Sequence, residues 1–259
     1  MIKKELKFKG RFWGGKRDAD GVVDPETFYH RYENLEANLE NTALLVVDVY
    51  GKGYDEGDPI PKNPVFSTKE HFFIEKDIIL NKIKPVLDEA RQKKMKIIFV
   101  ENRGDPYLAD ENSEYGKTVK RLTDVSVQEY FGKRDFDTKK REMLEYSKIL
   151  EPKEGEFVSK KRFYDGFTGT ELDYLLRNLG VKNLICIGFA TDICLFFTIY
   201  RAWTLNYKII LIRDATLGWE LFGESIKELD ITKKAIWFIE RLFGHTILTE
   251  DFLKACKLL

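Results

Sequence analysis

The chain has 259 residues, and its 43 Lys and Arg balance its 43 Asp and Glu, so it lacks the basic excess that binding to nucleic acid phosphates requires. Hydrophobic residues make up 43% and aromatic residues 14%, which excludes a globally disordered chain. No apolar run is long enough to span a membrane, the first residues hold no signal peptide, and three cysteines without a C-x-x-C motif make no disulfide framework, so we expect a cytoplasmic protein with neither a nucleic acid nor a membrane as partner.

The first 40 residues differ in pattern from the rest of the chain. They carry aromatic side chains among charges without a clean periodicity, and we expect an N-terminal arm over 1–40 that packs on its own core or on a neighbouring subunit. A regular domain over 41–259 follows. It begins with ALLVVD at 43–48, a continuous apolar and β-branched run that predicts a strand buried on both faces and ends in an acid.

The middle of the chain is predicted to hold a helix, a strand and a long irregular segment. Residues 75–94 place apolar side chains at helical spacing, although Pro85 lies inside the pattern. Residues 96–101 have the sequence KIIFVE and predict a second buried strand. Residues 102–150 are polar and contain several glycines, which predicts loops and short helices.

Strands and helices alternate regularly after residue 155. The pattern predicts strands at 156–161, 183–188, 208–214 and 245–249, and helices at 168–180, 192–206, 226–243 and the C-terminus. Alternation of this kind requires right-handed crossovers and a parallel sheet that helices cover on both faces. We therefore expect an α/β fold of three α/β/α layers with a mainly parallel sheet, whose ligand site lies at the carboxyl ends of the strands.

Reactive side chains follow two of the predicted strands. Asp48 ends the first strand, where partial desolvation suits a general acid or base. Lys161 follows Lys160 at the end of the strand at 156–161, so one of the two should point into the site and the other into solvent. Taken singly, such an Asp often caps a loop and such a Lys is usually a solvated surface charge. Beside a nucleophile, however, they would complete a catalytic constellation.

Cys194 is the candidate nucleophile. It lies in the first turn of the predicted helix at 192–206, with Thr191 or Asp192 as the expected N-cap. The helix dipole and the free backbone amides at this position lower the pKa of a thiol and can hold an oxyanion. The alternative is a buried cysteine that acts as a small hydrophobic residue, which is how we interpret the other two cysteines, Cys186 and Cys256.

These residues and their surroundings resemble the isochorismatase-like cysteine hydrolases. The resemblance covers roughly residues 41–252 and rests on three blocks in order: LLVVD at 44–48, KKRFYDGFTGTELDYLLRNLGVKNL at 160–184 and CIGFATDICLFFTIYRAWTLNYKIILIRDAT at 186–216. It implies that Asp48, Lys161 and Cys194 form a catalytic triad. It also implies a cis peptide just before Thr191 and an oxyanion hole made by the backbone amides of Ala190 and Cys194.

Within this family the chain is most similar to ureidoacrylate amidohydrolases and to biuret and triuret hydrolases, through KKRFYDGF, GFATDIC and the N-x-x-D element at 102–105. The resemblance implies that Asn102 contacts the substrate, and we also expect Tyr54 and Phe167 to do so. The chain departs from the family pattern after the first Asp, and at Gly104, near which ureidoacrylate hydrolases have a Trp. Since the members that cleave isochorismate lack the cysteine, the resemblance implies hydrolysis of a C–N bond in a small amide or ureide through an acyl-enzyme on Cys194.

No metal and no organic cofactor is expected. Nicotinamidases of this family carry an Asp-x-His metal pair after the second strand, whereas this chain has ENRGDP at 101–106 and three widely separated histidines. The run DADGVVD at 18–24 has its glycine at the fourth position instead of the sixth, so we interpret it as a turn and not as a calcium loop. No G-x-G-x-x-G follows the first strand, which argues against dinucleotide binding.

Several alternatives stay open from the sequence alone. The substrate could be another small amide, such as a carbamoyl or maleamate-like compound, or the chain could bind a small molecule or a partner protein without catalysis. A redox thiol protein is a third alternative, although Cys194 has no resolving cysteine. Oligomers are common in the family, so we expect a homo-oligomer, and the aromatic residues of the predicted helix at 192–206 would form either core or a subunit interface: Phe196, Phe197, Tyr200 and Trp203.

Overall fold

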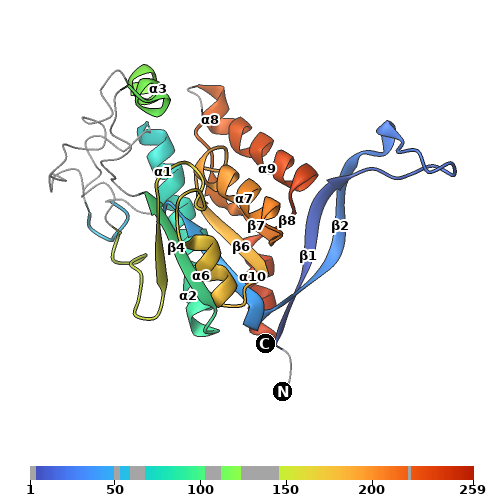
Figure 1. Cartoon of the computed structure of the whole chain (residues 1–259), viewed down its shortest axis with the longest axis horizontal. Coiled ribbons are helices and arrows are strands. Elements are labelled where there is room, and N and C mark those ends of the chain that lie inside the picture. The colour runs from blue at the N-terminus through green and yellow to red at the C-terminus, as the bar shows by residue number, and fades with distance from the viewer. Residues whose placement is uncertain (1–3, 50–52, 59–67, 103–111, 124–145, 221–222) are drawn as a thin grey trace.

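The structure is a computed structural model that describes residues 4–49, 53–58, 68–102, 112–123, 146–220 and 223–259. Within these residues, eight strands form one sheet in the order β2-β1-β8-β7-β6-β3-β4-β5. Helices lie on both faces of this sheet, and the first two strands extend from one side as a long hairpin (Figure 1). The expected α/β fold of three layers with a mainly parallel sheet is confirmed.

The strands run parallel except at the hairpin. Strands β3 to β8 pair in parallel with one another, whereas β1 pairs antiparallel with both β2 and β8. The strands are β1 (Glu5–Gly14), β2 (Tyr29–Asn38), β3 (Thr42–Val47), β4 (Lys96–Asn102), β5 (Phe157–Lys161), β6 (Asn183–Phe189), β7 (Lys208–Leu217) and β8 (His245–Ile247). The α-helices are α1 (Lys69–Ile78), α2 (Lys84–Gln92), α3 (Glu114–Thr123), α6 (Leu172–Asn178), α7 (Cys194–Thr204), α8 (Glu224–Glu228), α9 (Asp230–Leu242) and α10 (Thr249–Lys257).

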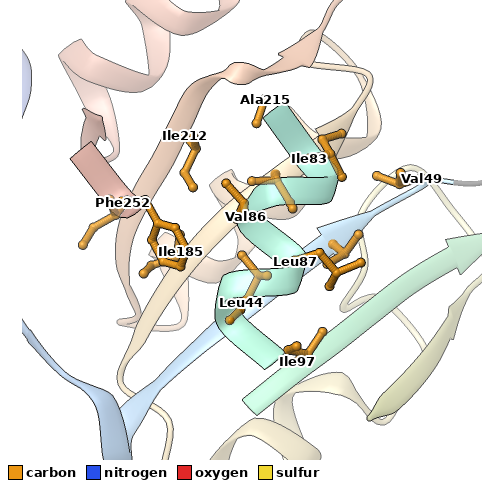
Figure 2. Packing of buried hydrophobic residues seen from close by; sticks show 14 of the residues in the cluster. Leu44, Val49, Ile83, Val86, Leu87, Ile97, Ile185, Ile212, Ala215 and Phe252 are labelled. Carbon is orange, nitrogen blue, oxygen red and sulfur yellow. The ribbon is translucent and has the colours of Figure 1, made fainter. Parts of the chain in front are cut away.

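The central strands are buried because helices pack on both of their faces. Leu44 of β3 lies in one hydrophobic cluster with Val86 of α2 and Phe252 of α10 (Figure 2). The next residue, Leu45, lies in a second cluster with residues of α6, α7 and α9, since successive side chains of a strand point to opposite faces. A strand buried on both faces has a continuous apolar sequence instead of an alternating one. This is why the four central strands could be predicted, although β7 extends three residues beyond its expected end.

The helix predicted at 75–94 begins earlier and is not uniform. The hydroxyl of Thr68 accepts a hydrogen bond from the amide of His71 and caps α1, so the helix starts at Lys69. Between α1 and α2, residues 79–83 form a π-helical turn directly before Pro85. Proline lacks an amide hydrogen and cannot continue an α-helical ladder, so the wider turn lets the chain pass this residue without ending the helix.

Two later helices differ from their predicted bounds. The hydroxyl of Thr170 donates to the backbone before α6 and holds it in a turn, so the helix predicted at 168–180 covers only Leu172–Asn178. The helix predicted at 226–243 is divided into α8 and α9 at Leu229, whose φ of 54° is left-handed. In the irregular segment 102–150, the structure describes residue 102, residues 112–123 with α3, and residues 146–150, and the rest lies outside the described residues. No helix in the described ranges has the length and apolarity to cross a lipid bilayer.

The N-terminal arm is a β-hairpin whose first strand joins the sheet. β1 and β2 pair along their whole length, and Arg11 of β1 pairs with Thr246 of β8. Leu6 and Phe8 of β1 are buried in the hydrophobic cluster that also contains Leu44. The interpretation that these residues lack a periodicity is wrong, because Leu6 and Phe8 alternate with charged residues as a half-buried strand requires.

Candidate active site

The topology brings three candidate residues to one edge of the sheet. β3 lies between β6 and β4, and β5 lies beside β4. Because these four strands are parallel, their carboxyl ends meet at the same edge. Asp48 follows β3, Lys161 ends β5, and Cys194 begins the helix that follows β6. This edge is where parallel α/β sheets bind their ligands.

The chain turns sharply at Asp48. Its φ of 49° lies in the left-handed region, which Asp tolerates better than most residues with a side chain. Its amide donates to the carbonyl of Val100 in the neighbouring strand at 2.8 Å, so the turn is tied to β4. The carboxylate is only 7% exposed, and its Oδ2 lies 2.9 Å from Nζ of Lys161.

Lys161 is the buried member of the lysine pair at the end of β5. Side chains alternate along a strand, and here Lys160 is 59% exposed and 3.6 Å from Glu101, whereas the side chain of Lys161 is fully buried. A buried ammonium is costly unless charges and hydrogen bonds compensate it. The expectation that one lysine of the pair points inward and the other outward is thus met.

The ammonium of Lys161 is the centre of the candidate site. Besides the ion pair with Asp48, Nζ donates a hydrogen bond to Sγ of Cys194 at 3.4 Å, to the carbonyl of Phe163 at 3.2 Å and to Oδ1 of Asn102. One buried cation therefore joins a carboxylate, a thiol and an amide oxygen that come from three different strand ends.

Cys194 is the first residue of α7, but the helix is not capped as expected. The N-cap is Ile193, and no side chain caps the helix. The hydroxyl of Thr191 shares a hydrogen bond with that of Thr216 at 2.6 Å, and the carboxylate of Asp192 accepts one from an amide that follows β7 at 2.8 Å. The predicted N-cap is wrong because both side chains hold the loop after β6 to the end of β7.

The protonation of the site differs from the prediction. Burial raises the pKa of the Cys194 thiol, the neighbouring charge of Asp48 raises it further, and Lys161 only partly opposes this. The net shift of the thiol pKa is therefore upward, opposite to the lowering that we expected from a helix N-terminus. Burial disfavours the charge on Lys161, but Asp48 and Cys194 outweigh that effect and raise its pKa. Both shifts favour the protonated forms, a neutral thiol and an ammonium.

Two backbone amides between the end of β6 and the start of α7 have no hydrogen-bond partner among the described residues: those of Ala190 and Cys194. The amides of Ile193 and Leu195, in contrast, both donate to the carbonyl of Ala190 at 3.1 Å. The cis peptide lies between Phe189 and Ala190. It is thus one position earlier than expected, since the prediction placed it just before Thr191.

The structure brings one of the three expected substrate-binding residues to the triad. Asn102 lies there, with its Oδ1 on the ammonium of Lys161; Gly104 and Asp105, also singled out in the sequence, lie outside the described residues. The hydroxyl of Tyr54 donates to a carboxylate of α1 at 2.6 Å, and Phe167 is buried with its ring 6.2 Å from that of a tyrosine before β7. The described contacts of these two residues thus lie in the two hydrophobic clusters and not at the triad.

An aromatic group beside Cys194 was not predicted from the sequence. The ring of Tyr115 in α3 lies 6.1 Å from Phe163 and 6.2 Å from Tyr164, and Tyr164 stacks on Phe197 of α7 at 6.2 Å. Burial, and after it neighbouring charge that includes Cys194, raises the pKa of both tyrosines. Tyr164 could have been noticed from its place in KKRFYDGF, whereas α3 lies in the segment whose sequence showed no pattern.

The histidines have other roles. His71 lies 3.0 Å from the carbonyl of Gly218, His30 lies 3.0 Å from Glu240, and His245 lies 2.6 Å from a carboxylate of β2. Among the residues that the structure describes, no group of three or more His, Cys, Asp or Glu side chains is placed to hold a metal ion.

Comparison with known proteins shows that the chain is similar to hydrolases. Residues 42–251 match the family described as Isochorismatase domain. The chain is 26% identical over 251 residues to the ureidoacrylate amidohydrolase RutB of Pantoea ananatis (strain LMG 20103), covering 93% of this chain and 92% of the relative. It is also 26% identical over 244 residues to RutB of Variovorax paradoxus (strain S110), covering 91% and 89%.

Solved structures show the same fold. A cysteine hydrolase from Pseudomonas syringae pv. phaseolicola 1448A is similar with a TM-score of 0.64 and 24% identity, over 86% of this chain and 95% of that chain. An N-carbamoylsarcosine amidase from Thermoplasma acidophilum is similar with a TM-score of 0.52 and 21% identity, over 81% of this chain and 97% of that chain.

Proposed function

Because the chain belongs to the isochorismatase family, we propose that it is a cysteine-dependent amidohydrolase that cleaves a C–N bond of a small amide or ureide. The observation that carries the proposal is the buried ammonium of Lys161, which lies 2.9 Å from the carboxylate of Asp48 and 3.4 Å from the thiol of Cys194. The relatives named ureidoacrylate amidohydrolase, which align with about nine tenths of the chain, support an amide bond as the target and a ureide as the substrate class.

In the first half of the reaction, Sγ of Cys194 attacks the carbonyl carbon of the substrate and forms a C–S bond. The thiol proton passes to the carboxylate of Asp48, which shares the ammonium of Lys161 with the thiol. The ammonium of Lys161 keeps its proton and stabilises the negative charge as it moves between carboxylate and sulfur. The carbonyl oxygen becomes an oxyanion, which the amides of Ala190 and Cys194 hold.

The adduct then breaks its C–N bond, and Asp48 gives the proton to the leaving nitrogen, which departs as ammonia or an amine. A thioester remains on Cys194. In the second half, Asp48 accepts a proton from water, the hydroxyl attacks the thioester, and the C–S bond breaks. The sulfur regains a proton from Asp48, so one water and one amide are consumed and the three side chains return to their starting states.

The aromatic group beside the triad favours a flat substrate. The ring of Tyr115 lies 6.1 Å from that of Phe163 and 6.2 Å from that of Tyr164. Planar conjugated groups stack well on aromatic faces. A ureide, which is planar and has no bulky substituent, suits such a wall better than a branched amide does.

Ammonia release from a substrate panel tests the proposal. The panel holds ureidoacrylate, biuret, triuret, nicotinamide and simple carbamoyl amides, and the enzyme is compared with Cys194→Ala and with Cys256→Ala, which removes a buried thiol from α10. We expect release from a ureide by the wild type and by Cys256→Ala but not by Cys194→Ala. Rapid-quench mass spectrometry should find the acyl group on the peptide that contains Cys194.

Two results would contradict the proposal in different ways. Ammonia release that persists in Cys194→Ala would exclude the acyl-enzyme on this residue. Silence of the wild type on every compound of the panel would exclude the substrate class and would favour a role in binding without catalysis.

A further inference from the structure

An aromatic and basic surface on α7 and α9 is left uncovered by the rest of the described chain. Three aromatic side chains of α7 and one of α9 are each more than 40% exposed, and two basic side chains are exposed among them. We call this set the α7/α9 face: Phe197, Tyr200, Arg201 and Trp203 of α7, and Lys234 and Phe238 of α9. Phe243, at the end of α9, joins the two helices, since its ring lies 5.5 Å from that of Tyr200 and 5.6 Å from that of Trp203. Apolar patches of this kind on a protein surface mark an interaction site.

The hairpin of β1 and β2 ends in a second uncovered apolar surface, which we call the tip, residues 15–28. Val22 is 61% exposed and Val23 is 41% exposed. The turn that presents them is well formed, because the carboxylate of Asp18 accepts hydrogen bonds from the amides of Asp20 at 3.0 Å and Val22 at 2.8 Å. The tip stands away from the rest of the chain (Figure 1).

The base of the hairpin is fixed, so the tip is held in that position. The buried carboxylate of Glu240 in α9 lies 2.7 Å from Nε of Arg11 and 3.0 Å from Nε2 of His30. The ring of Trp13 contacts that of Trp237, also in α9, at 6.0 Å. These contacts with α9 involve residues of β1 and β2 and none of the tip. A two-stranded ribbon is marginally stable at best in water, so an outer end that displays valines needs a surface to pack on.

The charges of the two surfaces are complementary. The tip contains four acids, all within the run DADGVVDPE at 18–26, and two bases, Lys16 and Arg17, so its net charge is −2. On the α7/α9 face, Arg201 and Lys234 are exposed, and α7 contains no acid. Within the described residues, neither of these cations has an ion-pair partner. The acidic, apolar tip is thus complementary in charge and in apolar character to the basic, aromatic α7/α9 face.

We propose that the tip of one chain docks on the α7/α9 face of a second copy of the same chain. Each chain carries one tip and one face, so a reciprocal pair with two-fold symmetry covers both surfaces at once. The contact would border the active site, because Phe197 of the face stacks on Tyr164 beside Cys194. It would also assign the exposed aromatic residues of α7 to a subunit interface, and leave only Phe196, which is half-buried, to the core.

Charge reversal tests this pairing in the full chain. The tip variant carries Asp20→Lys and Glu26→Lys, and the face variant carries Arg201→Glu and Lys234→Glu; none of these four side chains forms a hydrogen bond or ion pair in the described residues. A third variant combines all four changes. The control carries Glu151→Lys and Glu154→Lys, two exposed acids in the turn before β5.

Sedimentation velocity over a concentration series gives the oligomeric state and the dissociation constant. We expect the wild type and the control to self-associate equally. Each single-surface variant should dissociate about tenfold more readily or more, since attraction becomes repulsion at two positions. The combined variant should regain most of the affinity, because each reversed tip then meets a reversed face. Melting temperatures within a few degrees of the wild type verify that the variants fold.

Three outcomes would overturn the proposal. The wild type could be a monomer at every concentration, in which case no second copy covers the two surfaces. Self-association that neither single-surface variant weakens would place the interface elsewhere on the chain. Self-association that both variants weaken and the combined variant does not restore would show that the tip and the face do not pair with each other.

Discussion

The buried ammonium of Lys161 makes a quantitative prediction about stability. In Lys161→Met the side chain keeps most of its length but loses its ammonium, so the carboxylate of Asp48, 7% exposed, loses its ion-pair partner at 2.9 Å. Removing one member of a buried ion pair costs about 3–5 kcal/mol. The matched change Lys160→Met removes an adjacent lysine that is 59% exposed and 3.6 Å from Glu101. An exposed pair of this kind contributes about 0–1 kcal/mol.

The loss of stability in Lys161→Met should also depend on pH. A buried carboxylate without its cation can avoid the cost of an unpaired charge by taking up a proton in the folded state. For an aspartate with an ordinary pKa of about 3.9, that uptake costs about 1.4 kcal/mol for each pH unit above this value, or about 4 kcal/mol at pH 7. The folded variant then binds one proton more than the unfolded chain, so its stability falls as the pH rises. Its deficit should therefore shrink by about 2–3 kcal/mol between pH 7 and pH 5.

The wild type should not show this dependence on account of Lys161. The folded pKa of Lys161 is raised, so its contribution is fully present below the ordinary lysine pKa of about 10.4 and is lost only as the pH rises through the folded pKa. Urea denaturation of the three proteins at pH 5 and pH 7 measures both effects. A Lys161→Met protein that is no less stable at pH 7 than Lys160→Met, or a deficit that does not shrink at pH 5, would refute the assignment of a compensating ion pair.

Three further predictions concern other parts of the molecule. Alkylation of Cys194 by iodoacetamide should be slow at neutral pH and accelerate only well above the ordinary thiol range, because burial and Asp48 raise its pKa; a rate at pH 7 equal to that of a free thiol would contradict this. Gly188→Ala should prevent folding, because at a φ of 117° its Cβ would lie 2.0 Å from the carbonyl oxygen of Val47, whereas Gly155→Ala, with a φ of 87° and open space around it, should cost only about 1–2 kcal/mol in thermal unfolding. Glu240→Gln should loosen the hairpin by weakening the pairs with Arg11 and His30, so amide exchange in β1 should rise while that in β3 stays constant; equal protection of β1 in both proteins would count against this anchor.

Those parts of the site that depend on strand order could be predicted from the sequence. The runs ALLVV and NLICIG are continuously apolar because both faces of β3 and β6 are covered. Once these runs are assigned to parallel strands, the residues that follow them must share one edge of the sheet. Asp48 and Cys194 could therefore be predicted to lie near each other, although they are far apart in the sequence.

Features that depend on contacts distant in the sequence could not be predicted. Thr191 and Asp192 are good N-cap residues in isolation, but Thr191 bonds Thr216 of β7 and Asp192 accepts from the amide of Trp219 just after β7. Tyr54 follows the first strand closely enough to suggest a role in the site, yet its hydroxyl binds Glu75 in α1. Local sequence indicates what a polar side chain can bind, and only the fold decides which partner is nearest.

The thiol pKa illustrates the same limit and bears on the proposed mechanism. A helix N-terminus favours a thiolate, but the effect is confined to the first turn of a helix, whereas burial removes water from the whole site. A raised thiol pKa favours the neutral thiol, so in the proposed mechanism the attack on a carbonyl requires a base, and the raised pKa of Lys161 disfavours the neutral amine that could serve as one. We therefore propose Asp48 as the group that accepts the proton, since the fixed charge of Lys161 would let a single carboxylate accept it from sulfur and later deliver it to nitrogen.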